Sequence, residues 1–220
     1  AIDGPAGAGK STIARRLAER LGFAFLDTGA MYRAVALVAL RRGLGDGDGG
    51  EIARIAQELS IDFDGVRTLV DGEDVSPQIR TPEVTAAVYL AADNVSVRER
   101  LVELQRAIAG SRDIVTEGRD QGTVAFPDAE AKIFLTASRQ ERARRRYDEL
   151  LARGEAATYE DVLANQDARD QRDAEREVGA LRKAADAVEV STDGLSLEQV
   201  VDRLESLVGA RRRTLAQAGR

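Results

Sequence analysis

Gly4-Pro5-Ala6-Gly7-Ala8-Gly9-Lys10-Ser11 is the most informative stretch of this sequence. It matches in full the glycine-x4-glycine-lysine-serine/threonine pattern of a phosphate-binding loop. Glycines let the backbone turn so that several N–H groups face a phosphate, the lysine adds a point charge, and the serine hydroxyl can bind Mg²⁺. The loop predicts binding of a nucleoside triphosphate with Mg²⁺. By itself it does not separate a kinase from a GTPase or a motor.

The residues on either side of this loop supply the context that the motif requires. Ala1-Ile2-Asp3 is typical of the end of a strand, part of which we expect to precede Ala1. Ile13, Leu17 and Leu21 recur every four residues, which predicts an amphipathic helix that begins near Lys10. Gly22 is the expected end of that helix. Strand, glycine-rich loop and helix thus follow in the expected order.

Farther along the chain, apolar runs and turn residues alternate. They predict strands near 23–26, 113–116, 132–135 and 187–190, and helices near 29–42, 51–59, 82–109 and 197–208, with long charged helices between the last two strands. Residues 43–50 form a flexible connection, and Asp64-Gly65 and Asp71-Gly72 mark turns within an antiparallel insertion over 60–80. We therefore expect a three-layer α/β fold with a central parallel five-stranded sheet, a small antiparallel β insertion and a helical lid.

Composition excludes several classes of function. The 220 residues include 43% hydrophobic residues, enough for a core, and no apolar run approaches the ~20 residues of a membrane span. A net charge of -6 argues against broad nucleic-acid binding. Cysteine and histidine are absent, so thiolate chemistry and imidazole ligands are excluded, and any proton transfer would use carboxylates. We expect a cytoplasmic protein with no membrane partner.

Four further segments narrow the class of P-loop protein. Residues 26–33 read Leu-Asp-Thr-Gly-Ala-Met-Tyr-Arg, residues 117–129 begin Glu-Gly-Arg-Asp-Gln-Gly, and residues 169–176 read Arg-Asp-Gln-Arg-Asp-Ala-Glu-Arg. Residues 72–81 include Gly-Glu-Asp-Val-Ser and Ile-Arg-Thr. Together with the phosphate loop, this ordered set resembles the bacterial cytidylate kinase family over essentially the whole chain.

The resemblance implies ATP-dependent phosphorylation of CMP and dCMP with Mg²⁺, a role in pyrimidine nucleotide metabolism, and a monomer. It also implies a single kinase unit with a core (about 1–50, 83–141 and 166–220), an insertion that binds the nucleoside monophosphate (about 51–82) and a lid (about 142–165).

Site residues carry over from the family residue by residue. The catalytic candidates are Lys10, Arg119 and Arg176. The ATP-binding candidates are Gly4, Pro5, Ala6, Gly7, Ala8, Gly9, Lys10, Ser11, Thr12, Arg145 and Arg146. The CMP-binding candidates are Thr28, Tyr32, Arg33, Arg98, Arg119, Asp120, Arg169, Asp173 and Arg176. Ser11 is the expected Mg²⁺ ligand. Glu117 ends the third strand and could act on Mg²⁺ from behind the direct ligands, in place of a Walker B aspartate, or could form a structural salt bridge.

These residue types suit the chemistry. Arginines such as Arg33, Arg119 and Arg169 can hold a monophosphate by paired hydrogen bonds. The resemblance implies that Asp120 and Arg98 read cytosine, because a carboxylate and a guanidinium match its amino group and its carbonyl.

Simpler interpretations stay open for two helical groups. Arg169, Asp173 and Arg176 share one helix face, which also suits a salt-bridged solvated surface. Arg142, Arg145 and Arg146 lie together on a predicted helix that could be merely exposed, with Arg145 paired to Glu141.

Two other functions remain open at this point. A P-loop kinase for a hydroxyl acceptor, such as shikimate, a deoxynucleoside or dephospho-coenzyme A, would need a carboxylate base, and Asp27 or Asp120 could serve. The arginine set and the hairpin insertion disfavour it. A nucleotide-dependent switch would need switch segments and a Walker B aspartate after an apolar strand, and the sequence shows neither.

Overall fold

The computed structural model of the protein describes residues 1–64 and 67–218. It divides into two compact units. The first comprises Ala1–Leu26 with Ser111–Arg220, and the second is Asp27–Gly110.

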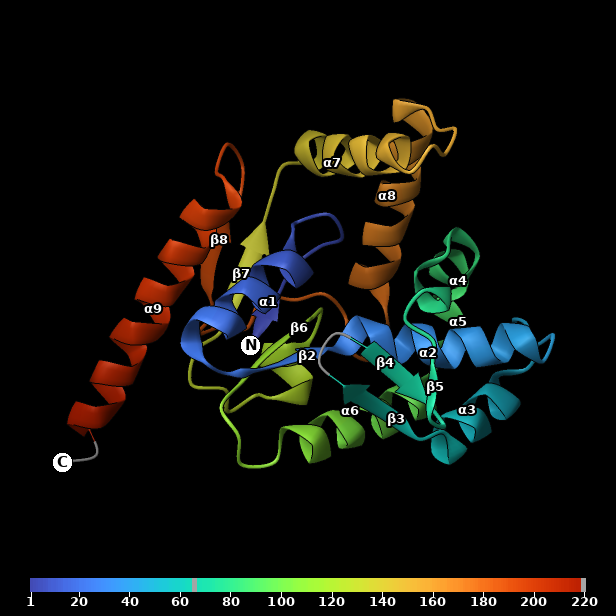
Figure 1. Cartoon of the computed structure of the whole chain (residues 1–220), viewed down its shortest axis with the longest axis horizontal. Helices are drawn as coiled ribbons and strands as arrows, with labels where there is room; N and C mark the ends of the chain where they lie inside the picture. Colours follow the sequence, from blue (N-terminus) through green and yellow to red (C-terminus); the bar gives the residue numbers. More distant parts are fainter. Residues whose placement is uncertain (65–66, 219–220) are drawn as a thin grey trace. The chain divides into compact units, whose positions relative to one another are not determined.

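The first unit contains the main sheet (Figure 1). Its strands are β1 (Ile2–Asp3), β2 (Ala24–Asp27), β6 (Ile114–Gly118), β7 (Ile133–Thr136) and β8 (Val188–Ser191). Their order is β2-β6-β1-β7-β8, and the short β1 pairs in parallel with β6 and β7, opposite Glu117 and Ile133. Parallel strands bring their carboxyl ends to one edge of a sheet, where ligands usually bind. The predicted five-stranded parallel sheet is confirmed.

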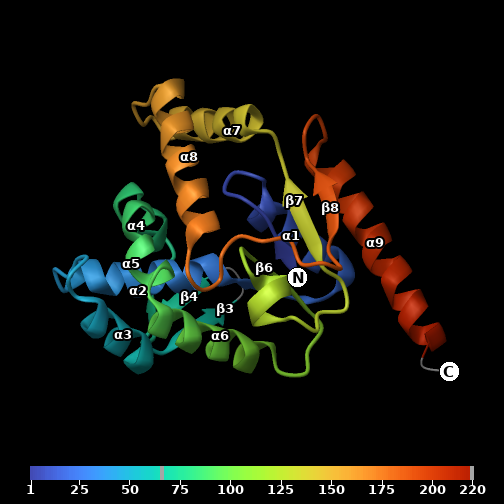
Figure 2. The same ribbon diagram turned by 180° about the vertical axis from the view of Figure 1, so that it is seen from behind.

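Two helices share the core with this sheet. They are α1 (Lys10–Leu21) and α9 (Leu197–Ala218), which lies beside β8 in both views (Figures 1 and 2). Ile13 and Leu17 of α1 and Leu204 of α9 are almost fully buried with Leu135 of β7. Burial of each such side chain contributes about 1.5–3 kcal/mol, so the four-residue apolar spacing read from the sequence does fix α1 on the sheet.

A second pair of helices follows β7. They are α7 (Arg139–Ala152) and α8 (Tyr159–Glu175), which pack against each other. Ser138 and Thr158 cap their first turns. The last residue of the predicted helical face, Arg176, lies just beyond α8 with ψ 135°, so the helix ends one residue before it.

The second unit is mostly helical. It contains α2 (Thr28–Arg41), α3 (Gly49–Glu58), the 3-10 helix η1 (Gln78–Arg80), α4 (Pro82–Ala87), α5 (Tyr89–Ala92) and α6 (Val95–Ala109). Helix α2 contacts all the others and is buried on nearly every side, which explains its almost continuous apolar sequence. Residues 82–109 are helical as predicted, although they form three helices, and Asn94 caps the last.

The small sheet of this unit has the antiparallel order β3-β4-β5, from β3 (Ile61–Asp64), β4 (Arg67–Val70) and β5 (Glu73–Asp74). This confirms the predicted insertion. Positive φ angles at Asp71 and Gly72 make the predicted second turn. The predicted turn at Asp64-Gly65 includes a residue that lies outside the described ones. Over the described part of the chain, no helix combines the length and apolarity needed to cross a membrane.

Candidate active site

The phosphate loop joins β1 to α1 in the first unit. Gly4, Gly7 and Gly9 all have positive φ angles, which favour glycine. A Cβ at Gly4 would lie 2.1 Å from the carbonyl oxygen of Leu135, so no other residue fits there. Gly9 precedes the first turn of α1, which no described side chain caps. The free N–H groups of that turn suit an anion.

Lys10 is buried at the start of α1 and donates from Nζ to the carbonyl oxygen of Pro5 at 2.8 Å. Burial, together with Arg119 and Arg169, lowers its pKa to about 7, against the opposing effect of two nearby carboxylates. A bound phosphate would favour the charged form of Lys10 and raise its pKa again, so the lysine lies where an anion would stabilise it. These interactions also show that Arg119 and Arg169 lie close enough to Lys10 to act on its charge.

Ser11 follows Lys10 and donates from its hydroxyl to Oε1 of Glu117 at 2.8 Å. Glu117 is buried on β6, directly opposite Ile2 of β1. Ser11 and Glu117, the two residues predicted from the sequence to act on Mg²⁺, are therefore in contact. Oxygen atoms of this kind are the ligands that Mg²⁺ prefers. Among the described residues, no group of three or more acids, cysteines or histidines is placed to hold a metal ion by itself.

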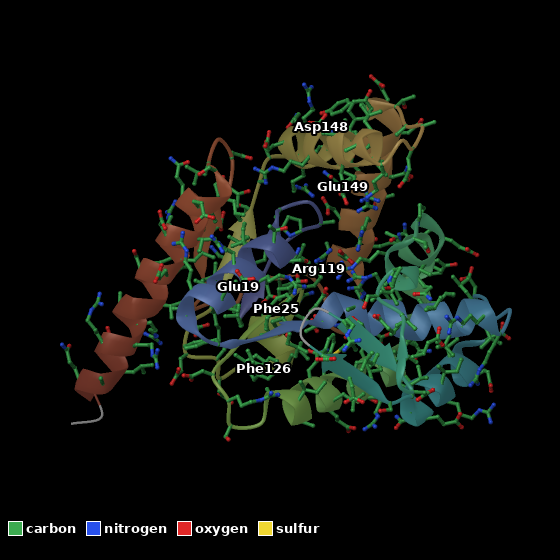
Figure 3. All side chains as sticks on the ribbon, in the orientation of Figure 1. Glu19, Phe25, Arg119, Phe126, Asp148 and Glu149 are labelled. Atoms are coloured by element: carbon green, nitrogen blue, oxygen red, sulfur yellow. The ribbon has the colours of Figure 1, made fainter. Side chains whose placement is uncertain are left out.

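An arginine–aspartate cluster lies at the end of β6 and the end of α8. Arg119 donates from Nε to Asp173 at 2.7 Å, and Arg176 donates to the other carboxylate oxygen at 2.7 Å. Figure 3 shows Arg119 between the end of β6 and α8. Burial alone would raise the pKa of Asp173, but Arg119, Arg176 and Arg169 outweigh it and lower the pKa to about 2. Asp173 is therefore ionised near neutral pH and holds the guanidinium groups of Arg119 and Arg176 together, with Arg169 close enough to act on its charge.

Asp3 fixes the segment that follows Arg119. Its buried carboxylate accepts hydrogen bonds from the backbone N–H groups of Gln121 and Gly122 at 2.8 and 2.7 Å. Burial raises the pKa of Asp3, and the two N–H bonds oppose that effect only in part. These contacts hold the π-helical turn η2 (Gln121–Ala125), next to the buried Asp120. The residue before the phosphate loop thereby positions the segment that carries Arg119 and Asp120.

The arginines of α7 differ in what they contact. Arg142 donates to the carbonyl oxygens of Ala6 and Ala137 at 2.9 and 3.1 Å and pairs with Asp170. Arg145 donates to Thr192, just after β8, and also pairs with Glu141 at 2.9 Å.

Arg146 is more exposed than Arg142 and pairs with Glu149, labelled on α7 in Figure 3. Of the two predicted ATP-binding arginines, Arg145 therefore reaches the end of the sheet, whereas Arg146 pairs on the helix itself.

The remaining predicted acceptor residues lie in the second unit. Thr28 and Tyr32 are buried on α2, and the guanidinium of Arg98 stacks 5.2 Å from the Tyr32 ring centroid. Arg98 also donates to the carbonyl oxygen of Ala92 at 3.0 Å. Arg33 donates to Asp27 at 3.2 Å. The structure thus brings together Tyr32 with Arg98 in this unit, and Lys10 with the arginine–aspartate cluster in the other.

Comparison with known proteins adds the decisive observation. The family model described as cytidylate kinase matches residues 1–209. The chain belongs to the cytidylate kinase family. This membership confirms the resemblance noted in the sequence.

Cytidylate kinases of two bacteria illustrate the relationship. That of Rhodopirellula baltica is 51% identical over 207 residues, covering 94% of this chain and 90% of its own. That of Pelotomaculum thermopropionicum is 51% identical over 218 residues, covering 97% and 96%. A solved structure of an uncharacterized protein from Eubacterium ventriosum shares the fold, with a TM-score of 0.51 at 12% identity over 95% of this chain and 96% of that one.

Three residues near these candidates were not predicted from the sequence. Arg142, Asp3 and Arg80 each make contacts with carbonyls, N–H groups or a carboxylate that are distant in the chain. The sequence places Arg142 with Arg145 and Arg146 on a predicted helix, and Ile79-Arg80-Thr81 supports only the cytidylate kinase resemblance. No local pattern distinguishes such residues from the many other arginines and aspartates of this chain.

Proposed function

We propose that the protein transfers the γ-phosphate of ATP to CMP, and to dCMP, giving CDP or dCDP. One observation carries the proposal: in a member of the cytidylate kinase family, the phosphate-loop lysine lies within electrostatic reach of Arg119, Arg169 and Asp173. A triphosphate-binding loop beside guanidinium groups suits a reaction in which donor and acceptor are both phosphates.

On the donor side, the backbone of residues 4–12 would hold the β-phosphate, and Lys10 would contact the β- and γ-phosphates. Ser11 and Glu117 would hold Mg²⁺ directly or through water, with most remaining ligands supplied by the nucleotide. When bound, Mg²⁺ adds positive charge at the transferring phosphate. Arg145, beside Thr192 at the end of the sheet, and Arg146 would face ATP from the lid.

On the acceptor side, Arg33, Arg119 and Arg169 would hold the phosphate of CMP. Asp120 and Arg98 would read the cytosine. Thr28 and Tyr32 would line the part of the site that holds the cytosine. Asp173 and Arg176 would lie at the ribose, and Arg176 would also contact the transferred phosphate. The existing Asp173 contacts support these last roles, because they already fix Arg119 and Arg176 on one anion.

The reaction needs no strong general base. One oxygen of the acceptor phosphate attacks the γ-phosphorus, the bond from that phosphorus to its bridging oxygen breaks, and ADP leaves with the electron pair. A phosphate monoester has a second pKa of ~6, so near pH 7 the attacking oxygen already carries charge. A chain without histidine can therefore catalyse this step by holding and neutralising the phosphates through Lys10, Arg119 and Arg176.

We further propose that residues of about 142–165 act as a lid, residues of about 51–82 as the monophosphate-binding insertion, and the rest as the core. Closure of the lid would exclude water from the transferring phosphate and limit futile ATP hydrolysis. Arg142 supports this division, because it joins α7 to the phosphate loop at Ala6. We also propose that the protein acts as a monomer in the cytoplasm.

A panel of acceptors tests the function. Purified protein is incubated with MgATP and CMP, dCMP, UMP, AMP or GMP, and with shikimate as a hydroxyl acceptor. We expect CMP and dCMP to give the highest kcat/KM, and turnover with CMP to exceed ATP hydrolysis without acceptor by orders of magnitude. Equal rates with and without CMP would refute the proposal.

A further inference from the structure

A buried carboxylate in the second unit contacts two arginines at once. Asp27 precedes α2 and accepts a hydrogen bond from the N–H of Ala30 at 2.8 Å. Its oxygens also accept from Arg33 at 3.2 and 3.4 Å and from Arg80 at 3.2 Å. Arg33 lies on α2, whereas Arg80 is the last residue of η1, 53 positions beyond Asp27. We call Asp27, Arg33 and Arg80 the Asp27 cluster.

The charges of the Asp27 cluster do not balance. Within the described residues, neither Arg33 nor Arg80 has another ion-pair partner, so two guanidinium groups share one carboxylate. Arg41 in the same unit differs, because it pairs at 2.8 and 3.0 Å with Glu73. The Asp27 cluster therefore carries one surplus positive charge.

The Asp27 cluster also has unused hydrogen-bond donors. Nε of Arg33 is buried and has no hydrogen-bond partner among the described residues. Each guanidinium has five N–H groups, and Arg33 and Arg80 use only a terminal nitrogen on Asp27. A buried donor without a partner is costly, and an anion that supplied one would remove that cost.

Access and spacing suit a small anion. The side chain of Arg80 is 47% exposed and that of Arg33 20% exposed, whereas Asp27 is buried. Both arginines contact the same oxygen, Oδ2 of Asp27, so their terminal nitrogens lie near each other. Gly29 leaves room for this arrangement, because a Cβ there would lie 3.0 Å from Arg33 Nη1. A tetrahedral anion could bind both guanidinium groups at once.

A purely structural role for Arg80 explains less. Its neighbour Ile79 is fully buried and Thr81 caps α4, so the segment is already fixed on both sides of Arg80. Because about half of the Arg80 side chain is exposed, its ion pair adds little stability. If the role of Arg80 were only structural, no anion would balance the surplus positive charge of the Asp27 cluster.

We propose that Arg80 binds the phosphate of the acceptor nucleotide together with Arg33, and that Asp27 is the positioning residue that holds the two guanidinium groups side by side. The inference rests on the proposed function, in which Arg33 contacts that phosphate. It adds a second phosphate-binding arginine from η1, and it assigns Asp27 a role other than that of a base.

Calorimetric titration with CMP and with cytidine tests this directly, because the two ligands differ only by the phosphate. In Arg80→Gln we expect the Kd of CMP to rise about tenfold or more, and the Kd of cytidine to stay unchanged. Arg80→Lys, which keeps the charge and loses the planar fork, should fall between the wild type and Arg80→Gln. Arg41→Gln is the matched control, with a side chain 41% exposed, and should alter neither Kd.

The outcomes separate the inference from the function. If the wild type phosphorylates CMP and Arg80→Gln binds CMP as tightly as the wild type does, the inference is wrong and the function stands. Equal weakening of CMP and cytidine would assign Arg80 a structural role and also refute the inference. If the wild type neither binds nor phosphorylates CMP, the proposed function fails, and the inference fails with it.

Discussion

Replacing Asp173 with asparagine tests the electrostatic arrangement at the end of α8. Asp173 lies between Arg119 and Arg176, 2.7 Å from each, and its pKa is lowered from 3.8 to about 2. One pKa unit corresponds to about 1.4 kcal/mol, so the ionised carboxylate stabilises the folded state by about 2–3 kcal/mol at pH 7. Asp173→Asn keeps the shape of the side chain and removes its charge, so it should lower the free energy of unfolding at pH 7 by about 2–3 kcal/mol.

The stabilisation by Asp173 should change with pH in a defined way. Because the folded-state pKa lies below the unfolded one, the contribution is fully present above pH of about 5 and is lost as pH falls toward 2. With these pKa values it drops to about half near pH 3. The change between pH 5 and 3 is the informative one, because Lys10, whose pKa is lowered to about 7, also titrates between pH 5 and 8.

The assay is urea unfolding of the wild type and Asp173→Asn at pH 7, 5, 4 and 3, followed by circular dichroism. The difference in unfolding free energy should be largest at pH 7 and 5 and should shrink at pH 4 and 3. Asp167→Asn is the control, because Asp167 pairs with Arg139 on the exposed surface and its loss should change stability little. A difference that is near zero at pH 7, or that persists unchanged at pH 3, would refute the reasoning.

Three further substitutions probe the transferring phosphate, the cytosine and the ATP side of the proposed site. Lys10→Ala should lower kcat by at least about 100-fold without preventing folding, since the charge at the transferring phosphate is lost; a near-normal kcat in a coupled ADP assay would contradict its role. Asp120→Ala should lower the ratio of kcat/KM for CMP to that for UMP and leave the KM of ATP unchanged; the cytosine assignment fails if the ratio stays the same. Arg142→Gln should raise the KM of ATP several-fold, because Arg142 joins α7 to the phosphate loop at Ala6; an unaltered KM would show that this contact does not shape the nucleotide site.

The phosphate loop and its helix were predictable because their causes are local. Glycines with positive φ at Gly4, Gly7 and Gly9 and the apolar spacing of Ile13 and Leu17 act within a few residues of the loop. Strand positions were predicted to within one or two residues for the same reason. Cytidylate kinase membership was recognisable because its segments are contiguous in the sequence.

The rest depends on contacts between distant parts of the chain. The turn η2 is held by Asp3, which lies 118 residues from Gln121, and no pattern near Gln121 predicts it. Arg176 was expected on the helix, yet α8 ends at Glu175 and Arg176 reaches Asp173 from beyond the helix. Likewise, the sharing of Asp27 by Arg33 and Arg80 depends on how η1 packs against α2.

Transfer of the labelled γ-phosphate of ATP tests the central claim most directly. With MgATP and CMP, the account predicts that the label appears in CDP, one for each ADP formed, with little free phosphate. Label that appears mainly as inorganic phosphate, or ADP formation that does not depend on CMP, would contradict the proposed reaction.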